Sequence, residues 1–83
     1  MCTYVTTTAA VAGSGYGGED WFPLDRATVY FDHPQDAPLD HALCVDVWGN
    51  GERVAIELDA ASARRLAEAI LGILDEEEVR ALT

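Results

Sequence analysis

One ten-residue segment concentrates the side chains that could do acid–base or metal chemistry. Residues 32–41 read DHPQDAPLDH and contain both histidines of the chain, His33 and His41, together with three aspartates. Imidazole changes its protonation state near neutral pH, so a pair of histidines can give a proton to a substrate and take one from it. Cys2 would add a thiol, and Asp40 a carboxylate. These residue types fit proton transfer and metal ligation.

Three interpretations of this segment stay open. In the first, a metal ion is bound by Cys2, His33, His41 and either Asp40 or Asp36. Three Cys/His ligands with an open position are typical of zinc, and imidazole also suits iron or copper. In the second, His33 and His41 act as acid and base without a metal, and Cys2 or Asp40 orients or assists them. In the third, the histidines are ordinary loop residues, because the spacing His-x7-His is no metal signature.

Two hairpins are predicted to bring the histidines together. Asn50-Gly51 favours a two-residue turn, since a type I′ turn needs positive φ at both central residues. This turn pairs Val47 with Val54, Val45 with Ile56 and Leu43 with Leu58. Pairing His33 with His41 then sets Phe31 opposite Leu43, Val29 opposite Val45 and Ala27 opposite Val47. Both registers put the same middle-strand residues on one face, and a slip of one residue would turn them outward.

The other elements complete one small domain over residues 1–83. Strands are predicted at 2–12, 27–33, 41–48 and 52–58, with Gly13–Gly18 as a flexible loop and Trp21–Leu24 as an apolar connector. Antiparallel pairing of the first two strands places Cys2 near His33. Asp59 is expected to cap a helix over 60–74 whose apolar stripe is Ala63, Leu66, Ala67, Ile70, Ile73 and Leu74. A short helical turn at 76–82, opened by Asp75 and Glu78, ends the chain. The predicted fold is α+β, a four-stranded antiparallel β-meander with one C-terminal helix packed on one face.

One helix cannot cover both faces of four strands. The uncovered face is predicted to carry mixed polarity with two large aromatic side chains, Tyr30 and Trp48. We expect a homodimer to form through this face.

The charge of the chain excludes several classes of partner. Fifteen Asp and Glu against five Arg give a net charge of −10. Nucleic acids and anionic membrane surfaces are bound mainly through basic side chains, so neither is an expected partner. No stretch approaches the roughly 20 apolar residues of a membrane span. We therefore expect a cytoplasmic protein with reduced thiols.

Four stretches of the chain resemble a family of short bacterial proteins, about 80–100 residues long, of unknown function. They are MCTYVTT at 1–7, WFPL at 21–24, ATVYFDHP at 27–34 and LDAASA at 58–63. In that family a histidine often stands where this chain has Asp36, so the resemblance weakens a metal site built on many histidines. The presence of such proteins among biosynthetic genes implies a role in specialised metabolism.

The expected function is binding or conversion of a small metabolite at the Cys2, His33, His41 and Asp40 site. The reaction class would be a cofactor-free isomerisation, cyclisation or dehydration. One alternative is a non-catalytic oligomerisation or protein-interaction module. A second is a zinc or iron protein that binds a single divalent metal ion through Cys2, His33 and His41.

Overall fold

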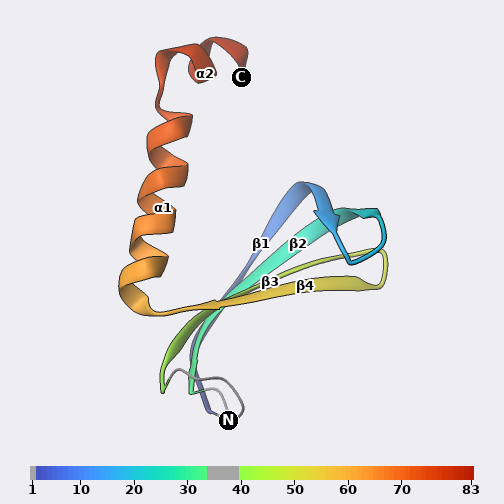
Figure 1. The fold of residues 1–83 in the computed structure, drawn as a ribbon, viewed down its shortest axis with the longest axis vertical. Helices are drawn as coiled ribbons and strands as arrows, with labels where there is room; N and C mark the ends of the chain where they lie inside the picture. The colour runs from blue at the N-terminus through green and yellow to red at the C-terminus, as the bar shows by residue number, and fades with distance from the viewer. Residues whose placement is uncertain (1, 34–39) are drawn as a thin grey trace.

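Four strands form one antiparallel sheet in chain order, followed by two helices (Figure 1). The computed structural model describes residues 2–33 and 40–83. The elements are β1 (Cys2–Tyr16), β2 (Trp21–His33), β3 (Ala42–Gly49), β4 (Glu52–Leu58), α1 (Ala60–Leu74) and α2 (Glu77–Leu82). The predicted α+β class and the order of the strands are confirmed.

The registers of the β2–β3 and β3–β4 pairs agree with the sequence prediction. In β3 and β4, Val45 lies opposite Ile56, and in β2 and β3 it lies opposite Val29. Asn50 and Gly51 have φ values of 52° and 77°, as a type I′ turn requires. At the far end of the sheet, Cys2 of β1 is paired with His33 of β2.

The first two strands are longer than predicted, because glycines that suggest a loop lie inside β1. Gly15 is paired with Phe22, and a Cβ atom at Gly15 would lie only 3.1 Å from Cζ of that ring. Phe22 itself is 7% exposed. The glycine therefore makes room for a buried aromatic ring, and the segment Trp21–Leu24 is strand rather than connector.

Helix α1 begins as predicted but contacts the sheet through its first turns only. The Asp59 carboxylate accepts a hydrogen bond from the Ser62 backbone N–H at 2.7 Å, which caps the helix. A single residue separates β4 from α1, and the helix and the strands diverge from this point (Figure 1). Its apolar stripe beyond the first turns is consequently open: Ile70 is 52% exposed and Leu74 51%.

Helix α2 begins one residue later than Asp75 and Glu78 suggest. Glu76 is its N-cap and makes no side-chain cap bond. Asp75 instead forms an ion pair with Arg80 at 3.3 Å.

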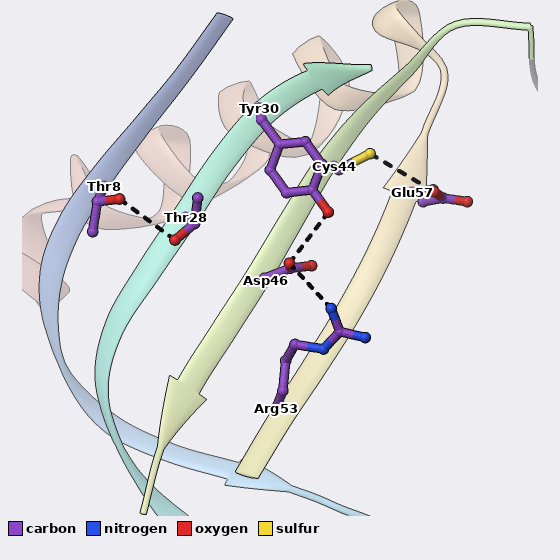
Figure 2. Close-up of polar contacts among 7 residues, drawn as sticks. All are labelled: Thr8, Thr28, Tyr30, Cys44, Asp46, Arg53 and Glu57. Atoms are coloured by element: carbon purple, nitrogen blue, oxygen red, sulfur yellow. Dashed lines mark hydrogen bonds and ion pairs between the residues drawn. The ribbon is translucent and has the colours of Figure 1, made fainter. Parts of the chain in front are cut away.

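The sheet has two chemically different faces. The apolar face carries Val5, Val29, Phe31, Leu43, Val45, Val47, Val54 and Ile56. The polar face carries Thr28, Tyr30, Asp32, Cys44, Asp46, Trp48, Arg53 and Glu57. Figure 2 looks onto the polar face, with α1 behind the sheet. The most buried side chains lie on the polar face, where Asp32 and Cys44 are each 1% exposed, whereas Val5 and Ile56 on the apolar face are 69% and 43% exposed.

Candidate ligand pocket and histidine pair

The two histidines lie against each other, as the predicted register requires. Asp32 is paired with Ala42, and the histidines are the next residues outward on the two strands. Their ring centroids are 5.4 Å apart and the ring planes meet at 89°, an edge-to-face contact. Both side chains are exposed. The structure thus places two imidazoles within reach of one bound molecule.

Two aromatic rings support the histidine pair. The Phe31 and His41 rings are stacked, 2° from parallel with centroids 6.1 Å apart. Tyr4 lies against the same two rings, at 5.9 Å from His41 and 6.1 Å from Phe31. A β-bulge between Thr3 and Val5 inserts Tyr4 as an extra residue, and so places its ring on the apolar face. Alternation along the sequence assigns Tyr4 to the opposite face from Val5. The structure differs because the sequence does not indicate the bulge.

A pocket opens between α1 and the apolar face, next to the histidine pair. Its volume is about 410 Å³, and it is lined by Val29, Phe31, Leu43, Ala60, Ala63, Arg64 and Ala67. The small alanine side chains on α1 leave this space, and Phe31 joins the pocket to His41. A second hollow of about 280 Å³ shares Val29, Phe31 and Leu43 and continues toward β1.

Arg64 is the charged residue of the pocket wall. Within the part of the chain that the structure describes, Arg26, Arg53 and Arg80 form ion pairs and Arg65 donates to the Ser62 hydroxyl at 2.9 Å, but Arg64 makes no such contact. Glu68, four residues further along α1, forms no ion pair with Arg64 among the described side chains. In a chain of net charge −10, this guanidinium is therefore open to an anionic group from outside.

Comparison with known proteins matches a family model to residues 1–83. The chain belongs to DUF6295, a family of unknown function. This agrees with the resemblance drawn from the sequence motifs as far as the family's unknown function is concerned. No curated protein and no solved structure matches the chain.

The other predicted site residues of this DUF6295 protein are brought together only in part. Cys2 is the strand partner of His33, while its side chain and Asp36 lie outside the described part of the structure. Asp40 is exposed. Among the side chains that are described, no three of His, Cys, Asp or Glu gather closely enough to hold a metal ion. The site of Cys2, His33 and His41 stays a prediction.

The polar face holds a network that the sequence did not indicate. Asp46 is 5% exposed and accepts hydrogen bonds from the Tyr30 hydroxyl at 3.2 Å and from Arg53 Nη1 at 3.5 Å (Figure 2). The Cys44 thiol lies 3.8 Å from a Glu57 carboxylate oxygen. Burial, together with Asp46, raises the pKa of Tyr30 to about 12. Burial, together with Glu57, raises the pKa of Cys44 to about 11. Both groups therefore keep their protons to a higher pH than an exposed tyrosine or cysteine would.

Three polar atoms on this face are buried without a hydrogen-bond partner among the described residues. They are Oδ1 of Asp32, Oδ1 of Asp46 and Nε1 of Trp48. The Trp48 ring is flanked by Arg26 and Arg53, whose Cζ atoms lie 4.9 and 5.4 Å from the ring centroid. Of these two arginines, Arg53 also contacts Asp46. Nothing in the alternation of the strands predicts that Asp32 and Asp46 would be buried.

In the described part of the chain, no helix is long and apolar enough to cross a membrane.

Proposed function

We propose that the protein binds a small molecule, with an apolar body and an anionic group, in the pocket between α1 and the sheet. The observation that carries this proposal is Arg64, a guanidinium without an ion-pair partner among the described residues, on the wall of an otherwise apolar pocket. The volume of about 410 Å³ falls in the range of small-molecule sites, which combine apolar walls with a few polar groups. Arginine is well suited to a carboxylate or phosphate because its N–H groups can donate two parallel hydrogen bonds.

In this proposal the histidine pair acts at the end of the pocket marked by Phe31. His41 stacks on that ring and His33 meets His41 edge-on, so a ligand lying along Phe31 meets both imidazoles. Cofactor-free proton transfer, as in an isomerase, cyclase or dehydratase of specialised metabolism, is the reaction class that such a pair would serve in the cytoplasm. Asp40, at the exposed end of the same strand pair, would assist.

Octanoate and octanol are suitable probes, because they share an apolar body and differ in charge. We expect octanoate to shift the NMR signals of Val29, Phe31 and Leu43 and to bind at least tenfold more weakly to the Arg64→Gln variant. Octanol should bind both proteins alike, since it lacks the carboxylate. Arg65→Gln is the matched control, because Arg65 is bound to Ser62 and does not line the pocket.

Two results would refute the proposal. One is the absence of any shift at the three pocket residues with octanoate in the millimolar range. The other is equal octanoate affinity of the wild type, the Arg64→Gln variant and the Arg65→Gln variant, which would show that the guanidinium does not select the ligand.

A further inference from the structure

The second half of α1 is apolar on every side and yet exposed. Residues 69–74 read AILGIL, without a charged or polar side chain. Leu71 and Ile73 are 60% and 63% exposed, and Ile70 and Leu74 are also half exposed or more. A helix that is apolar all round is normally buried. This segment therefore needs a cover that the single chain does not supply.

The apolar face of the sheet lacks a cover in the same way. Val5 is 69% exposed and Ile56 43%, and the valines between them are partly exposed, none of them fully buried. The helix reaches this face only near Ala60, Ala63 and Ala67, where the pocket lies. One chain thus presents two uncovered apolar surfaces, a sheet face and a helix.

The chain exposes more surface than a compact monomer, by enough for a dimer interface. The accessible surface is 6295 Å², about 1,400 Å² more than the roughly 4,850 Å² expected for a compact monomer of 9.0 kDa. The radius of gyration of 14.4 Å likewise exceeds the value of about 12 Å for a compact chain of this length. A stable interface buries about 800 Å² on each partner, so the excess is large enough for one.

We propose that a second copy of this chain covers both surfaces, each α1 lying on the apolar face of its partner. A two-fold pair is self-complementary, and here the exposed helix and the exposed sheet face belong to the same chain. On the apolar face, β4 carries Val54, Ile56 and Leu58, and the β3 residues opposite them are also apolar. None of these residues is acidic, so two copies of net charge −10 can meet there without burying carboxylates. This assignment does not depend on the proposed ligand.

The polar face is the competing surface for a dimer. It carries the Tyr30 and Trp48 side chains, through which the sequence predicted that two copies would meet. However, it also holds Asp32, Asp46 and Glu57, and its Trp48 ring already contacts two arginines of the same chain. Joining two polar faces would bring carboxylates of the two copies together, and their repulsion would weaken the dimer. Joining the apolar faces brings no carboxylates together.

Adjacent residues of β4 give a matched pair of variants. Ile56 and Ala55 are both exposed and lie on opposite faces of the sheet. Sedimentation equilibrium of the wild type should give twice the 9.0 kDa chain mass at tens of micromolar. Ile56→Lys should weaken this association at least tenfold, and Ala55→Lys should leave it within about twofold.

The wild type provides a second test if Ile56→Lys fails to fold. The thermal midpoint of a folded dimer rises with protein concentration by mass action, whereas that of a monomer does not. We expect a rise over a hundredfold range of concentration. A single-chain mass with a constant midpoint, a mass above two chains, or dissociation caused by Ala55→Lys but not by Ile56→Lys would overturn the proposal.

Discussion

Cys44 and Tyr30 hold their protons to unusually high pH because the polar face buries them beside carboxylates. The pKa of Cys44 is raised to about 11 and that of Tyr30 to about 12, with burial as the largest cause in both. These two residues lie in the packed polar face, whereas His33 and His41 are exposed and can contact a ligand. The sequence did not indicate the buried acids, Asp32 and Asp46, on the same face as Cys44.

Alkylation measures the protection of Cys44 directly. In a Cys2→Ser variant, Cys44 should react with iodoacetamide at pH 8.5 roughly a hundredfold more slowly than a free thiol of ordinary pKa, because the thiolate is the reacting form. The rate should rise about tenfold per pH unit up to the pKa. Reaction of the folded protein at the rate of a free cysteine would contradict this account.

Tyr30 makes the stability of the fold sensitive to alkali. Its pKa rises from 10.0 in the unfolded chain to about 12 in the folded protein, so the folded state binds more protons between these values and stability falls as pH rises from 10 toward 12. Tyr30→Phe should lose about 1 kcal/mol at neutral pH with the hydrogen bond to Asp46. It should also reduce the alkaline loss, with Cys44 carrying a further part because its pKa is raised as well. Urea unfolding at pH 7 and pH 11 measures both effects.

Tyr16→Phe is the control for this substitution, since Tyr16 is 54% exposed and lies on the edge strand against Trp21. Tyr16→Phe should change neither the free energy of unfolding at pH 7 nor its decrease between pH 7 and pH 11 by more than a few tenths of a kcal/mol. An unaltered alkaline loss in Tyr30→Phe would mean that another group carries the pH dependence.

At the scale of the elements, the apolar alternation determined both hairpin registers and therefore the contact of His33 with His41. Alternation could not reveal the bulge that adds Tyr4 to this cluster, or the extension of β1 through its glycines. Those features depend on which side chain fills the space opposite, as Phe22 does at Gly15. A sequence shows that a glycine is present, but the structure is needed to show what packs against it.

Gly49 is the glycine at which an added Cβ atom would clash most severely. A Cβ atom there would lie 2.7 Å from the Leu24 Cα and closer still to the Pro23 carbonyl oxygen, so backbone would have to move. Gly49→Ala should cost about 1–3 kcal/mol and lower the thermal midpoint by several degrees or more. Gly13→Ala, where an added Cβ meets nothing within 4 Å, is the control and should lower the midpoint little. Equal midpoints for the two variants would refute the close approach of β2 to β3.

For the whole molecule, the sequence predicted the amphipathic stripe of α1 but not what would cover it. The periodicity of Leu66, Ile70 and Ile73 shows that one side of the helix is apolar, whichever chain provides the sheet. Its own sheet meets only the first turns, because the single-residue connection at Asp59 leads the helix away (Figure 1). The chain is 49% hydrophobic, and the structure shows that many of these side chains remain exposed in a single copy. The composition alone does not predict this exposure.

Contacts between copies can be observed directly in a sample that mixes isotope-labelled and unlabelled chains. Isotope-filtered NOE spectra of such a sample record only protons that are close across the interface. We predict cross-peaks from the Ile70 and Leu74 methyl groups of one copy to Val45 and Val47 of the other. Absence of any intermolecular cross-peak, or cross-peaks confined to Tyr30 and Trp48, would contradict the pairing of each α1 with its partner's apolar face.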